Sequence, residues 1–143
     1  MDVKTWIKRD ENCELKPYKD TVGKTTIGWG RNIEDNGISQ DEADYLFEND
    51  LRRSVRELSG YEWYHSQPDD VKSALINMNF NLGITRFLGF KKMIAALKIK
   101  DYRQAAIEAL DSLWAKQVGN RARDIAIVIR EADASTTRTD STD

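Results

Sequence analysis

Apolar residues recur with helical spacing in several stretches of the chain. Between residues 40 and 59 they lie three or four positions apart and therefore share one face of a helix. They are Ala43, Leu46, Phe47, Leu51, Val55 and Leu58. Ser39 and Glu42 form a capping box before this run, and Gly60 is suited to its end. The pattern predicts one long helix from about residue 40 to residue 59.

A shorter helix is predicted at the start of the chain, before a segment of β character. Asp2 can cap this helix, Glu11 lies near its end, and its apolar face consists of Val3, Trp6 and Ile7. Residues 14–33 lack helical spacing and instead combine β-branched residues with turn-forming ones. These are Thr25, Thr26 and Ile27, and Asp20, Gly23, Gly28 and Gly30. Short strands are therefore expected here.

Caps and periodicity predict the helices of the second half. Ser66, with Pro68 in the first turn, begins a helix that ends at Gly83. Its apolar positions are Val71, Ala74, Leu75, Met78 and Leu82. Further helices are expected at about 90–98, at 102–113 after the cap Asp101, and at about 120–132. The last residues, ASTTRTDSTD at 134–143, are polar and aperiodic, which predicts a disordered tail.

This order of elements predicts a mostly helical α+β protein with two lobes. The long helix at about 40–59 would join a small antiparallel β lobe to a helical lobe. A length of 143 residues fits one compact domain or two small lobes that share a core.

Composition narrows the class of protein. Apolar residues make up 40% and charged residues 32%, which is typical of a globular protein. The single cysteine, Cys13, excludes an internal disulfide, and we expect it to be a small buried apolar residue. His65 stands alone, so we predict no metal and no cofactor. No apolar run approaches the ~20 residues that span a bilayer, and MDVKTWIKRDEN lacks a signal-peptide core.

The net charge of −2 conceals a basic region. Residues 86–130 contain ten Lys or Arg and four acidic residues, a net charge of +6. Such a region can attract an anionic polymer, for example a cell wall or a nucleic acid. The alternative is a set of solvated helix faces, which is the better interpretation of any single lysine.

Glu11, Asp20 and Thr26 form the pattern E-x8-D-x5-T around the expected strands. Hydrolysis of a glycosidic bond requires one protonated carboxyl to protonate the leaving oxygen. It also requires an ionised carboxylate to activate water or to stabilise the transition state. Two acids alone are weak evidence in a chain with 24 Asp and Glu, where both can be solvated surface groups.

The residues around these acids resemble a known family. DE-x2-E-L-K-x-Y-KD-T-x-G-x-x-TIG-x-G at 10–30 is similar to the active-site segment of the T-even type phage lysozymes, glycoside hydrolase family 24. ALINMNFNLG with a following GF at 89–90, and W-x5-NRA at 114–122, resemble later segments of the same family. The resemblance implies a lysozyme-like domain at 1–133. Its β lobe would cover about 13–38, and its helical lobe 1–12 and about 60–133.

The resemblance also implies roles for the three residues of the pattern. Glu11 would be the general acid, and Arg121 of the NRA motif would pair with it. Asp20 would be the second carboxylate, acting as a base or an electrostatic partner, although Asp before Thr and Gly also suits a turn. Thr26 would hold a water, although Thr also favours strands. The resemblance implies inversion, but the sequence does not give the distance between the carboxyls that separates inversion from retention.

Other positions are assigned with alternatives. Gly30 can let the chain approach a ligand, and the neighbouring Trp29 can stack on a sugar or pack in the core. The resemblance places three residues in the saccharide cleft, although Phe80 also suits a helix core: Asn32, Phe80 and Asn81. Met93 and Glu108 stand at two further cleft positions without matching the family, so they are left out. Trp114 is expected in the core, and the family's ion pair at Arg31 is expected to be absent.

The function implied is that of an N-acetylmuramidase that cuts the β-1,4 bond between N-acetylmuramic acid and N-acetylglucosamine in bacterial peptidoglycan. As a phage endolysin the protein would be bacteriolytic. It would act as a monomer without stable membrane association, and would remain in the host cytoplasm until a holin released it to the wall. Two alternatives are a saccharide-binding module without activity and a nucleic-acid binder. The three retained residues argue against the first, and the pI of 5.5 against the second.

Overall fold

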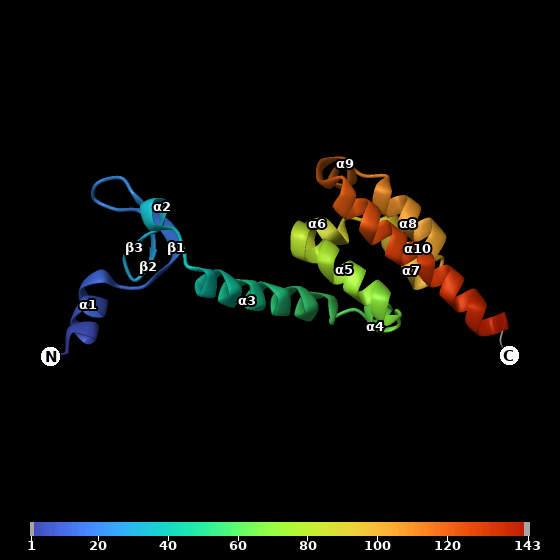
Figure 1. Cartoon of the computed structure of the whole chain (residues 1–143), viewed down its shortest axis with the longest axis horizontal. Coiled ribbons are helices and arrows are strands. Elements are labelled where there is room, and N and C mark those ends of the chain that lie inside the picture. Colours follow the sequence, from blue (N-terminus) through green and yellow to red (C-terminus); the bar gives the residue numbers. More distant parts are fainter. Residues whose placement is uncertain (1, 142–143) are drawn as a thin grey trace. The chain divides into compact units, whose positions relative to one another are not determined.

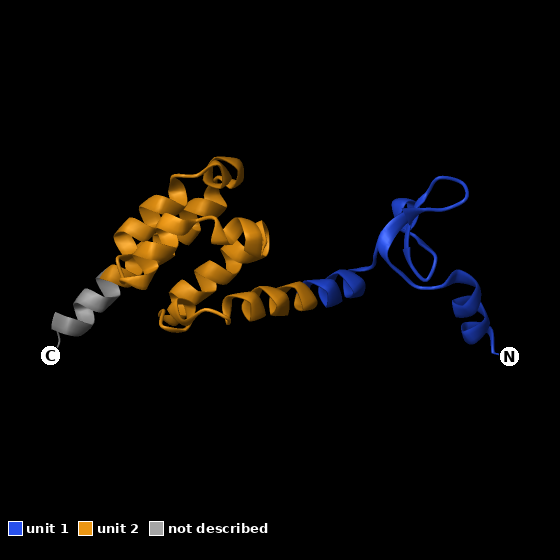
Figure 2. Cartoon of the chain, turned by 180° about the vertical axis from the view of Figure 1, so that it is seen from behind, with its two compact units in different colours: residues 1–47 blue, residues 48–143 orange. Residues whose placement is uncertain are grey.

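A computed structural model of the chain describes residues 2–141, with side chains for residues 2–133 (Figure 1). The chain forms two compact units, Met1–Phe47 and Glu48–Asp143 (Figure 2). The first contains a small antiparallel sheet, whereas the second consists of helices. This composition confirms the predicted mostly helical α+β class. The predicted limits of the lobes and of the lysozyme-like domain stay predictions.

The first unit begins with a helix and continues into the sheet. Helix α1 (Val3–Glu11) is capped by Asp2, whose side chain accepts hydrogen bonds from the backbone N–H groups of Lys4 and Thr5, as the sequence predicts. Strands β1 (Glu14–Lys19), β2 (Thr25–Gly28) and β3 (Arg31–Asn32) follow. They pair antiparallel in the order β1-β2-β3, which leads into the short helix α2 (Ile33–Asn36).

Helix α3 (Gln40–Leu58) forms where the apolar periodicity predicts it. Its capping box is present, because the Ser39 N–H donates to Glu42 Oε1 at 2.8 Å and the Glu42 N–H donates to Ser39 Oγ at 3.1 Å. The helix crosses the boundary between the two units at residues 47 and 48. Within the first unit, this cap fixes where the chain leaves the sheet region and becomes helical.

Arg31 forms an ion pair with Glu42, which sequence reasoning did not identify. The expected absence of the family's own pair at this position stays a prediction. Its guanidinium donates to both carboxylate oxygens of Glu42 and, at 3.2 Å, to the Gly37 carbonyl. Glu42 lies 11 residues along the chain and takes part in the α3 capping box as well. Because Glu42 lies at the start of α3, the pair ties β3 to this helix.

This pair makes the first unit sensitive to acid. The Ser39 N–H, the Ser39 hydroxyl and the Arg31 guanidinium together lower the pKa of Glu42 from its ordinary value of 4.5. A lowered pKa stabilises the fold above the unfolded-state value, and this contribution is lost as the pH falls through the folded-state value. In Glu42→Gln, the side-chain amide oxygen can still accept the hydrogen bond from the Ser39 N–H, but the negative charge is lost. We therefore expect the melting temperature of this variant to fall less than that of the wild type when the pH is lowered from 5 to 3. Identical pH profiles in calorimetry would contradict this role for Glu42.

The second unit consists of the end of α3, from residue 48 on, and of the helices that follow it. They are α4 (Glu62–His65), α5 (Asp69–Leu82), α6 (Ile84–Leu88), α7 (Lys91–Lys98), α8 (Tyr102–Leu110), α9 (Leu113–Val118) and α10 (Asn120–Ser141). Helix α10 packs against α5, α8 and α9, and α7 packs against α8. The largest side chains of this core are fully buried: Phe87, Leu58, Leu75, Met78, Met93, Leu97 and Ile129.

Several boundaries differ from the sequence-based expectation. Pro68 is the N-cap of α5 rather than a residue of its first turn, and Ser66 instead donates its hydroxyl to the Trp63 carbonyl. Helix α8 stops at Leu110, three residues earlier than predicted, and a new helix begins at Leu113 after the cap Ser112. The short helices α2, α4, α6 and α9 were not predicted, because four to six residues are too few to show a period of 3.6.

Two further expectations concern Cys13 and the chain end. Cys13 is exposed, which corrects the prediction of a buried thiol: it lies between α1 and β1, where its neighbours Asn12 and Glu14 are exposed too. Helix α10 continues to Ser141, past its predicted end at about residue 132. The predicted disordered tail falls on residues 134–143, whose side chains lie outside the described part of the chain, and it stays a prediction. Over the residues that are described, we find no helix with the length and apolar content needed to cross a membrane.

Candidate functional site

Glu11 and Gly30 meet at the edge of the first unit. Glu11 is the last residue of α1, and its side chain is exposed. A β-carbon placed on Gly30 would lie 2.6 Å from the Glu11 carboxyl carbon and closer still to Oε2, which is far inside van der Waals contact. Gly30 also has φ +74°, a conformation that favours glycine. Gly30 therefore permits a close approach between the turn at 28–30 and the Glu11 carboxylate.

The Glu11 carboxylate is left unbonded within its own unit. Among the described residues of Met1–Phe47, none donates a hydrogen bond to it or forms an ion pair with it. Asn12, which follows it, has φ 58° and ends the helix by donating its N–H to the Lys8 carbonyl at 3.0 Å. The turn at Asn12 thus directs the chain into β1 and leaves Glu11 at the helix end with a free carboxyl group.

The two carboxylate oxygens of Asp20 differ in their hydrogen bonding. Its Oδ1 accepts hydrogen bonds from the N–H groups of Val22 at 2.9 Å and Lys24 at 2.8 Å, and this holds the β1–β2 turn. Its backbone completes the turn, since its N–H donates to the Lys24 carbonyl at 2.9 Å. Over the part of the chain that the structure describes, Oδ2 has no hydrogen-bond partner. Asp20 is therefore a turn residue whose second oxygen is available for chemistry.

Thr26 lies in the central strand β2 and is 3% exposed. Its hydroxyl donates to the Lys24 carbonyl at 2.9 Å. A hydroxyl has one hydrogen to donate and two lone pairs, so Thr26 Oγ1 can still accept a hydrogen bond. Lys24 also bonds Asp20 Oδ1 through its N–H. One peptide segment therefore holds both Asp20 and Thr26 in place.

The strand register adds a residue that sequence reasoning missed. Thr26 pairs with Tyr18 of β1 on one side and with Asn32 of β3 on the other. Directly opposed residues in an antiparallel sheet share one face, so these three side chains form a row across the sheet. Tyr18 stands within the quoted motif as K-x-Y-KD, but only the pairing of the strands shows that it is a neighbour of Thr26.

Asn32 is used to cap helix α2. Its Oδ1 accepts from the Asp35 N–H at 3.0 Å, and its Nδ2 donates to Asp35 Oδ2 at 2.9 Å. A side chain engaged in this way is held in place, but it has less hydrogen-bonding capacity left for a ligand. The predicted contact of Asn32 with substrate stays a prediction.

The remaining predicted residues lie in the second unit. Phe80 and Asn81 are near the C-terminal end of α5 and are exposed. Asn81 Oδ1 accepts a hydrogen bond of 2.7 Å from the indole N–H of Trp114. Trp114 itself is 4% exposed, which confirms its expected place in the core. Arg121, in α10, donates through Nε to Asn77 Oδ1 at 2.9 Å. Its predicted pairing with Glu11 would join the two units and stays a prediction.

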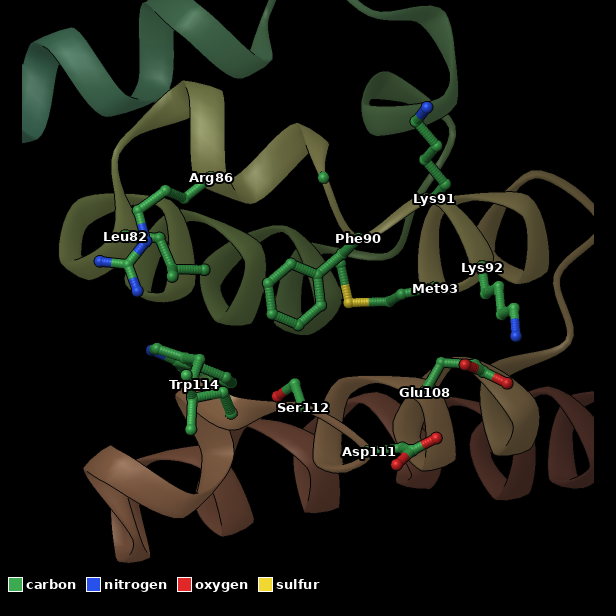
Figure 3. Close-up of a pocket in the computed structure, with 12 residues that line it drawn as sticks. Leu82, Arg86, Phe90, Lys91, Lys92, Met93, Glu108, Asp111, Ser112 and Trp114 are labelled. Atoms are coloured by element: carbon green, nitrogen blue, oxygen red, sulfur yellow. The ribbon is translucent and has the colours of Figure 1, made fainter.

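A pocket of about 540 Å³ opens beside Trp114 in the second unit (Figure 3). Phe90 and Trp114 meet edge to face at its centre, with ring centroids 5.9 Å apart. Figure 3 shows Met93 beside Phe90, Arg86 on the same side as Leu82, and Lys92, Glu108 and Asp111 together at the opposite end. The pocket therefore has an aromatic and thioether floor with charged residues at both ends.

Two residues that were left out of the site on the basis of the family resemblance line this pocket. Met93 and Glu108 do not match the family residues at their positions, yet both line the pocket together with Leu82, the neighbour of Asn81. No short motif unites these residues, because they come from α5, α7 and α8. Their shared position could be found only from the packing of these helices.

Comparisons with known proteins agree on one family. The family described as "Phage lysozyme" matches residues 8–133 of the chain. "Probable T4-type lysozyme 1" of Dictyostelium discoideum is 30% identical, over 89% of this chain and 92% of that protein. The "Pre-baseplate central spike protein Gp5" of Enterobacteria phage T4 is 30% identical over 90% of this chain, which corresponds to 28% of the spike protein. An "Endolysin" of Acyrthosiphon pisum secondary endosymbiont phage 1 is 29% identical over 80% of each chain.

Proposed function

The chain belongs to the phage lysozyme family of glycoside hydrolases, and we propose that Glu11 and Asp20 are the acid and the base with which it cleaves peptidoglycan. The bond cut is the β-1,4 linkage between N-acetylmuramic acid and N-acetylglucosamine. The observation that carries this assignment is the difference between the two carboxyl groups. Among the described residues of its unit, Glu11 has no hydrogen-bond or ion-pair partner. Within the same described residues, one carboxylate oxygen of Asp20 holds the β1–β2 turn and the other is unbonded.

In this mechanism Glu11 supplies the proton. Its carboxyl hydrogen passes to the glycosidic oxygen as the bond between that oxygen and the anomeric carbon breaks. General acid catalysis requires a proton donor within hydrogen-bond reach of the leaving oxygen. The position of Gly30 against the carboxyl group limits where Glu11 can turn, and so supports a defined direction for the transfer.

Asp20 and Thr26 together would prepare the water. Because the Thr26 hydroxyl hydrogen is already donated to the Lys24 carbonyl, Thr26 can only accept a hydrogen bond from the water. The water would give its other hydrogen to Asp20 Oδ2, which leaves a lone pair directed at the anomeric carbon. When the water attacks, its proton moves to Asp20, and solvent returns Glu11 and Asp20 to their starting states. This route predicts inversion at the anomeric carbon.

The second unit would bind the glycan strand and the groups attached to it. We assign Phe80 and Asn81 to saccharide contact, and Gly30 and Arg121 to support of Glu11. The hydrogen bond from Trp114 to Asn81 connects this part of α5 to the aromatic floor of the pocket. The pocket would therefore extend the binding surface beyond the two predicted residues.

The biological role we propose is that of an endolysin. One relative carries that name, whereas others are named as a probable T4-type lysozyme or as a pre-baseplate central spike protein. In this role the protein would act as a monomer, without cofactor, metal, nucleic acid or stable membrane association. It would wait in the host cytoplasm until a holin releases it to the cell wall.

A clearing assay tests this function. The purified protein is added to outer-membrane-permeabilised Gram-negative cells, and turbidity is followed together with the release of reducing sugar. Clearing with new reducing ends supports the hydrolase. Binding to sacculi without clearing would indicate an inactive saccharide-binding module. Retention on nucleic acid, with neither clearing nor binding to sacculi, would indicate a nucleic-acid binder. Co-expression in cells with and without a holin then tests the endolysin role, because lysis should require the holin.

A further inference from the structure

Lys8 and Trp29 form a contact beside the proposed acid. The Lys8 ammonium group lies over the indole ring of Trp29, 5.0 Å from the ring centroid. This is within the range at which a cation is attracted to the face of an aromatic ring. Trp29 is nevertheless 47% exposed, so the contact is not a by-product of burial in a core.

The contact lies next to the approach of Gly30 to Glu11. Lys8 precedes Glu11 by three residues on α1, a spacing that places both on the same side of the helix. Trp29 directly precedes Gly30 in the turn between β2 and β3. One side of α1 therefore touches one turn of the sheet region at two consecutive points, through Lys8 with Trp29 and through Glu11 with Gly30.

Helix α1 has little else to hold it against the sheet of its unit. None of its residues is buried, and Trp6 and Ile7 of its apolar face are each about half exposed. Its connection to β1 runs through Asn12 at φ 58° and the exposed Cys13. Without a packed core between α1 and the sheet, individual side-chain contacts determine how Glu11 is presented.

We propose that Lys8 and Trp29 are positioning residues for Glu11. Their cation–π contact holds the last turn of α1 against the 28–30 turn, so that the Glu11 carboxyl group stays beside Gly30 and points in one direction. The proposal rests on the proposed function of Glu11 as the acid. Neither Lys8 nor Trp29 needs to touch the reacting atoms. Their effect should therefore fall on the rate of the chemical step and not on substrate binding.

Four variants and one control test the proposal, with kcat and KM measured on dye-labelled soluble peptidoglycan. Lys8→Met and Trp29→Leu remove the cation and the aromatic face, whereas Lys8→Arg and Trp29→Phe keep them. Lys4→Met removes a positive charge one turn earlier on α1, from a residue that contacts no aromatic ring among the described residues. We expect Lys8→Met and Trp29→Leu to lower kcat roughly three- to tenfold at unchanged KM. Lys8→Arg and Trp29→Phe should retain most of the wild-type kcat, and Lys4→Met all of it.

The double variant Lys8→Met/Trp29→Leu provides the coupling measurement. If the two residues act through one contact, the kcat of the double variant should equal that of the single variant with the lower kcat. Circular dichroism and melting temperatures of all variants should match the wild type, which separates positioning from loss of fold.

Three results would overturn the proposal. Lys8→Met could keep the wild-type kcat, or Lys8→Arg could be as impaired as Lys8→Met. KM could also rise at unchanged kcat in Trp29→Leu, which would make Trp29 a saccharide platform instead. Glu11→Gln, assayed in parallel, distinguishes this failure from failure of the acid assignment. If Glu11→Gln is inactive while Lys8→Met is normal, only the positioning role is wrong.

Discussion

Replacing Glu11 with Gln is expected to lower the rate of peptidoglycan cleavage by about 10²- to 10⁴-fold, which is the usual contribution of a general acid. The amide has nearly the size and shape of the carboxyl group but has no acidic proton to transfer. Glu11 is exposed, and its carboxyl group has no hydrogen bond to the described residues of its unit, so the fold of the first unit should not depend on its charge. Melting temperature and circular dichroism should therefore be unchanged.

Glu14→Gln is the matched control for this experiment. Glu14 is another exposed glutamate, three residues along the chain at the start of β1, and the same chemical change removes the same charge. Its cleavage rate should stay close to that of the wild type. If Glu11→Gln kept more than half of the wild-type rate, or if Glu14→Gln lost as much activity as Glu11→Gln, Glu11 could not be the acid.

Gly30→Ala is expected to have the second-largest effect, a loss of activity of roughly 10²-fold. The added methyl group would lie 2.6 Å from the Glu11 carboxyl carbon, so either the carboxyl group or the turn must move by an ångström or more. A displacement of about 1 Å at a catalytic group costs on the order of 10²-fold in rate. The positive φ of Gly30 adds a conformational cost of about 1–2 kcal/mol for any other residue.

Gly28→Ala separates the displacement of Glu11 from the backbone cost. Gly28 has φ +70°, nearly the same as Gly30, but a β-carbon there meets no atom within 4 Å. Both variants should therefore lose similar stability in thermal unfolding, whereas only Gly30→Ala should lose most of its activity. Equal activity of the two variants would show that the approach of Gly30 to Glu11 has no part in catalysis.

Features encoded by neighbouring residues could be predicted from the sequence. Asp2, Asp101 and the pair Ser39 and Glu42 each cap a helix through hydrogen bonds that span two or three residues, so the local pattern is sufficient. The apolar positions of α5 were predicted correctly for the same reason, since a long amphipathic helix shows its buried face as a period.

Features that depend on distant residues could not be predicted. The Arg31–Glu42 pair exists because the start of α3 comes back to β3, and the sequence around Arg31 gives no sign of this. The bond from Trp114 to Asn81 spans 33 residues and requires α9 to lie beside α5. Cys13 was expected to be buried because of its residue type. Its actual exposure follows from its place in a connection between two elements.

The proposed catalytic residues could be predicted from the sequence only in part. Glu11, Asp20 and Thr26 were identified from their spacing and from the family resemblance. The sequence left Asp20 with two interpretations, as a turn residue or as a base. The structure shows that the first does not exclude the second, because one carboxylate oxygen holds the turn and the other remains unbonded within the described residues.

The central claim is that Asp20 and Thr26 activate a water while Glu11 protonates the leaving oxygen. NMR of the first product of cleavage, recorded before mutarotation, tests it most directly, because direct attack by water inverts the anomeric carbon. From the β-1,4 bond, the account predicts that the new reducing-end N-acetylmuramic acid appears first as the α-anomer. Initial release of the β-anomer would mean retention through a covalent intermediate and would contradict the proposed roles of Asp20 and Thr26.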